Sequence, residues 1–502
     1  MLVAKNPTPR RPKSPLKTNR RANLTKPRKN LLNDDQSPHN ESGLGPQNLS
    51  SASTILEQLV GMDEVSHLLD PKMRRNSRMV YTKGVTIWML ILQRLCKGAT
   101  LEQTVSHVLQ HDRQLFPENR RTEEFTLSAN PSSYSAARGR LDIDEIREFS
   151  HRVCDSFAHR SDPIVDGRRI FLLDGTTITL EPTAELTKAF PPAPNQYGQS
   201  VWPVAMLMVA AEMQTGCVLQ PQVDPMFGPE RSSEAKQSAE IVKKLPPGSI
   251  VMADSGFGIF SVARHTRCAG HDFLFRLTKS RFKAMVKKAT VIDSGKGYKS
   301  YRLHWLPSCK DRRSNPQLPS DAALDVILHC VDLENGDQLY LVTNLDFAAT
   351  SAAQLYSHRY EIEFDIRDLK VTMDAENLRA RSVEMALKEL MTSVIAFNLT
   401  MQFRRQAAKL ARVEPRRLSF KSCWVIFQDH LLLGDEEDFE GWQIRFTLAL
   451  ALAGQKRLPQ RSKPRSYPRV AHTRRQKSTK FMRSQAGKSD ANQPDPPPTG
   501  SK

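Results

Sequence analysis

The sequence predicts an α/β protein with a helical domain ahead of its α/β core and a basic, disordered tail at each end. Apolar residues recur at helical spacing through residues 54–160. From Arg168 onward, short apolar runs alternate with amphipathic stretches, as strands and helices do in α/β folds. Lys and Arg are concentrated in the first 30 residues and again after Gln455.

The net charge of +19 over 502 residues lies mostly in the two tails. Residues 1–30 carry ten Lys/Arg and residues 455–488 carry twelve, with no acidic residue in either stretch. Removing these 22 from the 73 basic residues leaves 51 against 54 acidic ones, a centre of −3. We therefore predict disordered basic segments at 1–50 and 455–502, which either bind a polyanion such as DNA or only keep the chain soluble.

Several classes of protein are disfavoured by the sequence. The seven cysteines are far apart and form no CxxC or Cys/His cluster, so neither a zinc site nor a disulfide framework is expected. The longest apolar run, Val201 to Ala211, is too short to span a membrane and contains Pro203. We expect a cytoplasmic, nucleoid-associated protein with reduced thiols.

Residues 54–160 are predicted to form the helical domain, a candidate for binding DNA. Four helices with start or stop signals are expected: 54–68 begun by a Thr54/Glu57 capping box, 85–97 ended by Gly98, 101–110 begun by Thr100/Gln103, and 143–157 begun by Asp142/Glu145.

The α/β part begins with RRIFLLDGTTITL, which predicts a strand, a tight Asp174-Gly175 turn and a second strand. Further strands are expected in VWPVAMLMVAA and CVLQPQV, followed by an amphipathic helix at 232–245. The run SIVMAD then predicts a buried strand that ends at Asp254.

Residues 255–349 are predicted to start with a helix at 259–268 and then to become rich in strands. The strand candidates are DFLFRL, YKSYRLHWL, LDVILHCV and QLYLVTNL. Helices are expected again from Ala352 to about Lys409 and from Trp424 to Ala453.

Three acidic residues have positions suited to a shared site. Asp174 and Asp254 are each expected at the end of an apolar strand, and Glu363 lies on the helix that follows the β-rich segment. Carboxylates at strand ends meet at one edge of an α/β sheet, where they can hold Mg²⁺. Taken singly, each is better explained by capping or a turn, so the hypothesis depends on the combination.

Glu363 belongs to the stretch YSHRYEIEFDIRDLK, in which Tyr356, Arg359, Glu363 and Lys370 are spaced for one helix. This spacing resembles the signature of the IS4-family DDE transposases. FLLDGTT around Asp174, VMADSGFG around Asp254, LYLVTNL, AFNLT and RLSF are also similar to sequences of that family. The resemblance covers roughly residues 50–450.

The resemblance implies a ribonuclease H-like core at 168–254 and 350–410, a β-strand insertion at 255–349 and a C-terminal helical part at 411–454. It implies that Asp174, Asp254 and Glu363 are catalytic and hold two Mg²⁺ ions, with Mn²⁺ as a substitute. Tyr356, Arg359 and Lys370 would contact DNA near the scissile bond. The implied activity is DNA cleavage and strand transfer by a dimer that binds element ends and target DNA.

Some alternatives remain open from the sequence. Asp365 and Asp368 compete with Glu363 on the same helix and are ranked below it. Glu234 could assist a metal or phosphate network, although a solvated helix face is favoured. Arg359 could simply pair with Glu363, and Lys370 with a neighbouring Asp. The family often has Arg at position 255 and Trp at position 360, where this chain has Ser255 and Tyr360.

Other functions also remain open. A metal-dependent nuclease on the same core would use the same acids, and a non-catalytic DNA-binding protein derived from a transposase would use none of them. A phosphatase with Asp174 as nucleophile is weaker, because Gly175 and Thr176 replace the expected Asp-x-Asp pattern.

Overall fold

The computed structural model describes residues 59, 79–96, 99–117, 119–195, 198–432 and 439–459. The predicted basic arm at 1–50, the Thr54/Glu57 capping box and the tail from residue 460 lie outside the described residues. Within the described ranges, no helix is both long enough and apolar enough to cross a membrane.

The N-terminal helices begin at the capping residues that the sequence indicates. They are α3 (Lys83–Leu95), α4 (Leu101–His111), α5 (Arg120–Glu123), α6 (Ser132–Arg140) and α7 (Ile143–His159). Thr100 and Gln103 form a reciprocal capping box at α4, and Asp142 accepts the amides of Asp144 and Glu145 at α7. These side chains satisfy amides that have no partner within the helix, which fixes where each helix starts.

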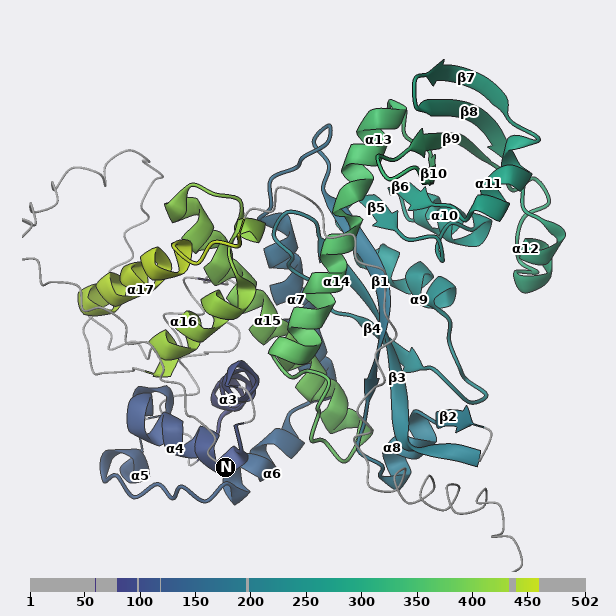
Figure 1. The fold of residues 1–502 in the computed structure, drawn as a ribbon. Helices are drawn as coiled ribbons and strands as arrows, with labels where there is room; N and C mark the ends of the chain where they lie inside the picture. The colour runs from purple at the N-terminus through teal and green to yellow at the C-terminus, as the bar shows by residue number, and fades with distance from the viewer. Residues whose placement is uncertain are drawn as a thin grey trace, which may run out of the picture. The chain divides into compact units, whose positions relative to one another are not determined.

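The α/β part is built on one mixed sheet (Figure 1). Its strands are β1 (Ile170–Thr179), β2 (Pro192–Asn195), β3 (Gly198–Glu212), β4 (Gln222–Pro225), β5 (Ile250–Ala253), β6 (Asp272–Arg276), β7 (Thr290–Gly295), β8 (Tyr298–Trp305), β9 (Leu324–Asp332) and β10 (Gln338–Thr343). The order is β2-β3-β1-β5-β6-β10-β9-β8-β7 within the described residues, with β4 also paired to β3.

The central five strands have the topology of a ribonuclease H-like core, which confirms the predicted fold class. In the order β4-β3-β1-β5-β6, β3 is antiparallel to both β1 and β4, whereas β5 and β6 run parallel to β1. Helices α9 (Glu234–Ile241) and α10 (Phe260–Cys268) connect the parallel strands, as parallel pairing requires.

Alternating side chains of β1 and β5 enter two apolar cores on opposite faces of the sheet. Ile170 and Leu172 of β1 belong to the larger core, which also contains residues of the long helix α15 (Val383–Ala411). Phe171 and Leu173 face the smaller core, with α9 and α10. Because both faces are covered, the strands read as continuous apolar runs rather than as an alternation.

The prediction of an Asp174-Gly175 turn is wrong. Residues 170–179 form one continuous strand, and Asp174 pairs with Val209 and Gly175 with Met208 of β3. The pairing of β1 with the long strand β3 continues past the dipeptide, so the strand ladder outweighs the local turn preference of Asp-Gly.

Strands β7 to β10 extend the same sheet rather than forming a separate one. β10 pairs with β6, and β9, β8 and β7 follow in an antiparallel series. Two short helices accompany them, α11 (Lys279–Val286) and α12 (Cys309–Ser314). Since β6 pairs in parallel with β5, we propose that the insertion begins after β6, at about residue 277, and not at 255.

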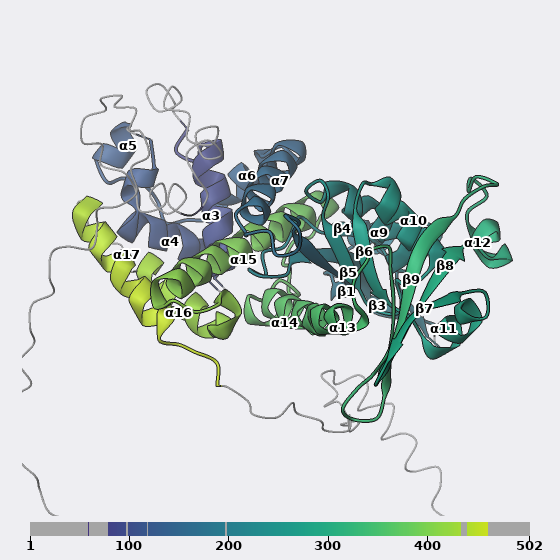
Figure 2. The ribbon, with the colours of Figure 1, turned by 90° about the horizontal axis from the view of Figure 1, so that it is seen from above.

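The signature stretch is helical but is not one regular α-helix. It consists of α13 (Ala349–Tyr356), a 3₁₀ turn at Ser357–Tyr360, α14 (Glu361–Arg367) and a π-turn at Asp368–Thr372. α13 and α14 lie end to end alongside the sheet (Figures 1 and 2). Changes of helix type of this kind alter the direction of the side chains that follow them.

The helical part of the molecule is organised around α15. This 29-residue helix is contacted by α3, α7, α16 (Phe420–Leu432) and α17 (Phe439–Gly454), and Figure 2 shows it running between them. Its residues from Lys388 to Arg404 are buried on all sides, which explains why it lacks an amphipathic pattern.

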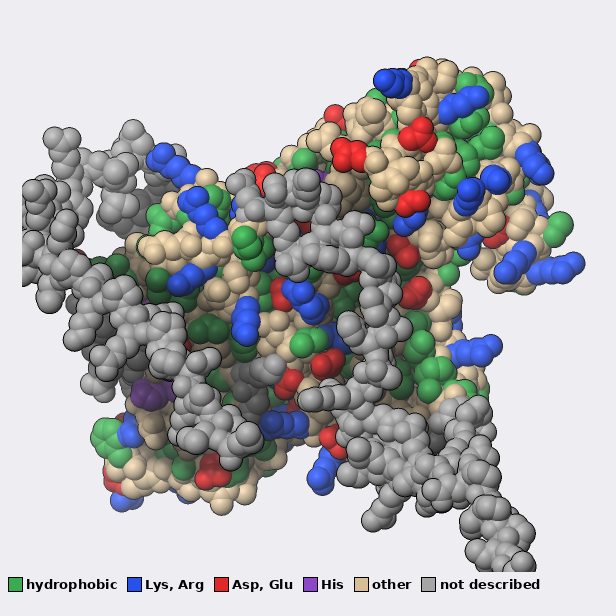
Figure 3. Space-filling model, in the orientation of Figure 1, with side chains coloured by type: hydrophobic (Ala, Val, Ile, Leu, Met, Phe, Trp, Pro, Cys, Tyr) green, Lys and Arg blue, Asp and Glu red, His purple; other side chains and the backbone are tan. Residues whose placement is uncertain are grey.

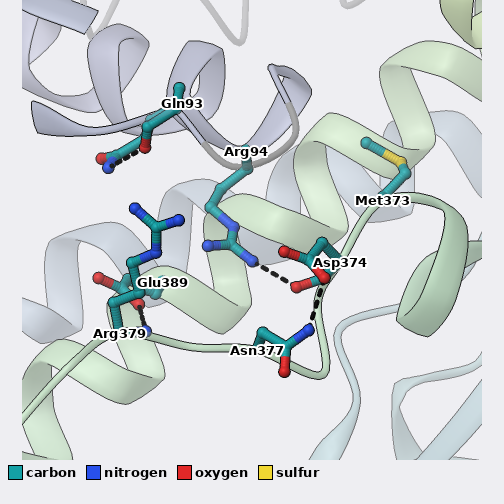
Figure 4. Close-up of a pocket in the computed structure, with 8 residues that line it drawn as sticks. Gln93, Arg94, Met373, Asp374, Asn377, Arg379 and Glu389 are labelled. Atoms are coloured by element: carbon teal, nitrogen blue, oxygen red, sulfur yellow. Dashed lines mark hydrogen bonds between the residues drawn. The ribbon is translucent and has the colours of Figure 1, made fainter. Parts of the chain in front are cut away.

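A small cavity lies where α3, the segment after the π-turn and α15 meet (Figure 4). Arg94 of α3 donates to the Asp374 carbonyl at 3.0 Å and to Ser393 Oγ of α15 at 2.8 Å. The backbone amide of Arg379 donates to Glu389 at 3.0 Å. None of the predicted catalytic residues lines this cavity, and its hydrogen bonds tie the N-terminal helices to the core.

Candidate active site at the carboxyl ends of β1 and β5

Two of the predicted acids are neighbours across parallel strands. Leu173 of β1 is in register with Ala253 of β5, so Asp174 and Asp254 are the next residues on two adjacent strands. Asp174 Oδ1 accepts the Gly175 amide at 2.9 Å, and Asp254 Oδ1 accepts the Gly256 amide at 2.8 Å. Each carboxylate is thereby anchored by one oxygen at the edge where α/β sheets commonly bind ligands.

The signature segment brings the third acid to this edge through an arginine. Arg359 Nη2 donates to Glu363 Oε1 at 2.5 Å, and Arg359 Nη1 lies 3.7 Å from Asp174 Oδ2. The Arg359 side chain is only 8% exposed, whereas that of Glu363 is 45% exposed. The Arg359–Glu363 pair is therefore more than a solvated helix-surface contact, because the same guanidinium also reaches Asp174.

Lys370 reaches β1 from the π-turn. Its Nζ donates to the Thr177 carbonyl at 2.6 Å and to Thr176 Oγ1 at 3.2 Å. The alternative pairing of Lys370 with Asp365 or Asp368 is not formed among the described residues. The ammonium group thus lies on the strand that carries Asp174, two to three residues further along.

Tyr356 is placed inside the site rather than on its surface. It is 4% exposed, and its hydroxyl has no hydrogen-bond partner among the described residues. Burial raises the pKa of its hydroxyl well above the ordinary value, and the charge of nearby Arg359 lowers that pKa in part. A DNA-contacting role for Tyr356, as for Arg359 and Lys370, stays a prediction.

The two rival acids of the signature segment have structural partners. Asp365 is buried and accepts two hydrogen bonds from Arg416, at 3.0 and 2.8 Å. Asp368 accepts a hydrogen bond from Thr372 Oγ1 at 2.9 Å. Because Glu363 alone of the three pairs with the arginine that reaches Asp174, the geometry favours the ranking of Glu363 above both rivals.

Glu234 was wrongly expected on a solvated helix face. It is the first residue of α9, and its carboxyl group lies against Gly175 of β1, beside Asp174. Its charge, like that of Asp254, acts on Asp174. The signal that could have located it is the glycine after Asp174, which leaves room over the strand.

The gathering of acids changes how Asp174 titrates. Burial raises the pKa of the Asp174 carboxyl to about 6, with Arg359 opposing the rise and Asp254 and Glu234 adding to it. Burial also raises the pKa of Glu234, with a contribution from Asp254. Carboxylates that repel one another in this way gain stability when a cation joins them.

Asp174→Asn is expected to stabilise the metal-free protein at neutral pH. The unfolded Asp174 ionises near pH 4 and the folded one near pH 6, so its ionisation costs stability that is lost progressively over this range and fully above it. In EDTA at pH 7.5, urea unfolding should show a gain of roughly 1–3 kcal/mol that disappears as the pH falls toward 4. Exposed Asp321→Asn serves as control, and an equal stability of wild type and Asp174→Asn at pH 7.5 would contradict the raised pKa.

The donor set suits a hard divalent cation, although the acids are not drawn together as ligands. No group of three His, Cys, Asp or Glu side chains in the described ranges is close enough to hold a metal as it stands. The reason is visible in the ion pairs, since Arg359 lies between Asp174 and Glu363. The oxygen-only chemistry of these side chains is nevertheless that preferred by Mg²⁺.

Comparisons with known proteins agree with this arrangement. The family model of the transposase DDE domain matches residues 166–399, a range that contains all three predicted acids. Transposase InsG for insertion sequence element IS4 of Escherichia coli (strain K12) is 24% identical over 357 residues, which are 68% of this chain and 77% of that protein. A chain of the piggyBac transposase synaptic complex with hairpin DNA, solved by cryo-electron microscopy, has a TM-score of 0.39 at 10% identity, over 85% of this chain and 90% of that chain.

Proposed function

The chain belongs to the IS4 family of DDE transposases, and on that premise we propose that it cuts DNA at the ends of an insertion sequence and joins them to target DNA. The observation that carries this proposal is the juxtaposition of Asp174 and Asp254 at adjacent strand ends with the Arg359–Glu363 pair across them.

In the proposed site, Asp174, Asp254 and Glu363 would hold two Mg²⁺ ions, or Mn²⁺ in their place. Such ions, when bound, activate the attacking oxygen and stabilise the leaving oxygen of a phosphodiester. Glu363 would leave Arg359 to serve as a ligand, which frees the guanidinium to bind a phosphate. Lys370, held on β1 next to the acids, would bind a second phosphate, and Tyr356 would hydrogen-bond or stack beside them.

The proposed reaction has two phosphoryl transfers. Water first attacks the phosphodiester at the element end, and the P–O bond to the element's 3′ oxygen breaks to release a 3′-OH. That 3′-OH then attacks a target phosphodiester, which forms a new P–O bond as the target strand is cut. A dimer would bring two element ends together, and this oligomeric state is likewise proposed.

Strand transfer in vitro tests the proposal directly. The DNA that flanks the chain's own coding locus would be the substrate, with Mg²⁺ present or replaced by EDTA. Joined products that require the metal are expected. Nicks without joining would favour the nuclease alternative, and binding without any chemistry would favour a non-catalytic DNA-binding protein.

The insertion carries a positive surface that supports DNA as the partner. Residues 279–313 contain eleven Lys/Arg and two Asp/Glu, a local charge of +9 within a centre of −3. Figure 3 shows Lys and Arg side chains spread over the surface formed by β7, β8, α11 and α12. The exposed members are Lys279, Lys283, Lys287, Lys288, Lys296, Lys299, Arg302, Lys310 and Arg313.

Replacing Lys283, Lys287 and Lys288 together with Gln is expected to weaken DNA binding and its salt dependence. The slope of log K against log salt decreases by about 0.9 for each phosphate that the variant no longer neutralises, so it should fall by about 2 to 3. Fluorescence anisotropy with duplex DNA between 50 and 200 mM salt measures this. A triple variant at scattered exposed lysines, Lys188, Lys409 and Lys456, is the control, and equal slopes for the two triples would contradict a specific role of the insertion.

A further inference from the structure

Glu234 lies at the catalytic edge without a cationic partner of its own. It begins α9, the helix that crosses from β4 to β5, and its side chain extends over β1 at Gly175. Among the described residues no ion pair reaches Glu234, whereas Glu240 on the same helix pairs with Lys243 at 2.8 Å. The carboxylate has therefore been brought beside Asp174 and Asp254 with no cation of the protein to balance it.

Two glycines form the cradle in which the Glu234 carboxyl group lies. A Cβ atom at Gly175 would come within 2.8 Å of Glu234 Cδ and still closer to its Oε1. A Cβ atom at Gly256 would lie 3.0 Å from Asp254 Oδ1 and 3.8 Å from Glu234 Oε2. Both glycines directly follow the predicted acids, at positions one and two residues beyond them, so the backbone leaves space for a third carboxylate between the first two.

A simpler explanation for a glutamate here is its position in the first turn of a helix. Carboxylates are favoured at that position by about 0.3–1 kcal/mol, because they interact with the partial positive charge of the helix N-terminus. That effect requires no particular direction of the side chain and no glycine opposite it. The close approach to Gly175 and Gly256 points instead to a position selected for its geometry.

We propose that Glu234 is a fourth carboxylate ligand of the divalent-cation site, acting with Asp174 and Asp254 at the ends of β1 and β5. The inference rests on the proposed function, because it assumes that this edge binds a cation. It assigns Glu234 to the ion nearer the strand ends, whereas Glu363 approaches from the signature segment and Arg359. An ion there would join three carboxylates that otherwise repel one another.

Calorimetric titration of the full chain with Mn²⁺, in the absence of DNA, tests the assignment without relying on activity. Glu234→Gln keeps the size of the side chain and is expected to weaken Mn²⁺ binding by about tenfold or more. Asp254→Asn should weaken it as well, and Glu240→Gln, on the same helix, should bind as the wild type does. Melting temperatures without metal show that each variant is folded.

Gly175→Ala provides a second route to the same answer if Glu234→Gln does not fold. The added methyl group would push the Glu234 carboxyl group away while leaving its charge, so Mn²⁺ affinity should fall to a similar extent. In the double variant the two losses should not add, because both remove one ligand.

The outcomes separate this inference from the proposed function. Wild-type affinity in Glu234→Gln together with weakened binding in Asp254→Asn would remove Glu234 from the ligand set and leave the transposase site intact. Unchanged binding in both variants would show that the ion is held elsewhere, which would overturn the proposed metal site and this inference together.

Discussion

Replacing Glu363 with Gln is expected to reduce metal-dependent DNA cleavage and strand transfer by a factor of about a thousand or more, with DNA binding retained. A thousandfold loss corresponds to about 4 kcal/mol of transition-state stabilisation. Removal of a ligand leaves the metal poorly held at the moment when charge develops on the phosphate oxygens. Gel assays of cleaved and joined products at saturating Mg²⁺, beside anisotropy measurements of binding, separate the two effects.

The structure provides a matched control five residues further along the same segment. Asp368 is an acid of the signature stretch that bonds to Thr372, and Asp368→Asn should keep cleavage within a few-fold of wild type. If Asp368→Asn were as inactive as Glu363→Gln, the segment would be sensitive to any change in charge. Full activity of Glu363→Gln would exclude Glu363 as the third acid.

Arg359 explains why the three acids are not already arranged around a metal. Its guanidinium contacts Glu363 and approaches Asp174, so it occupies the place of the missing cation. Binding of a metal and of DNA phosphate would therefore exchange partners, with the carboxylates turning to the ions and Arg359 to the phosphate. This exchange costs little, since each charged group is paired both before and after it.

The sequence predicts the core strands and helix starts well, because these depend on local pattern. Thr100 and Asp142 cap their helices as expected, and the run before Asp254 forms β5. Asp174-Gly175 fails because its turn preference is local, whereas the pairing that keeps it extended comes from β3, more than twenty residues away. A short local pattern cannot include a partner at that distance.

The site is only partly predictable for a related reason. Spacing identifies Tyr356, Arg359, Glu363 and Lys370 as a unit, but a regular helix would not turn Lys370 onto β1, as the π-turn does. Glu234 is missed because its importance depends on the packing of α9 against β1. Neither feature follows from residue spacing, because both are set by how elements distant in sequence meet.

Arg416→Ala is expected to destabilise the protein by about 3–5 kcal/mol, the usual cost of leaving a buried charge without its partner. Arg416 donates two hydrogen bonds to Asp365 and one to the Met213 carbonyl at 2.6 Å, and it pairs with Glu361. The Asp365 side chain is 2% exposed, so without Arg416 its carboxylate would lie uncompensated in the core beneath α14.

Urea unfolding of Arg416→Ala, Asp365→Leu and the double variant measures this cost. Most of the loss should be recovered when Asp365 is also replaced, because the penalty arises from the unpaired charge rather than from the absent hydrogen bonds. Arg152→Ala, which breaks the exposed pair with Glu148, should cost no more than about 1 kcal/mol. If Arg416→Ala cost as little as Arg152→Ala, another cation would have to neutralise Asp365. The position of α14, and with it that of Glu363, would then be fixed by packing against β1 rather than by this ion pair.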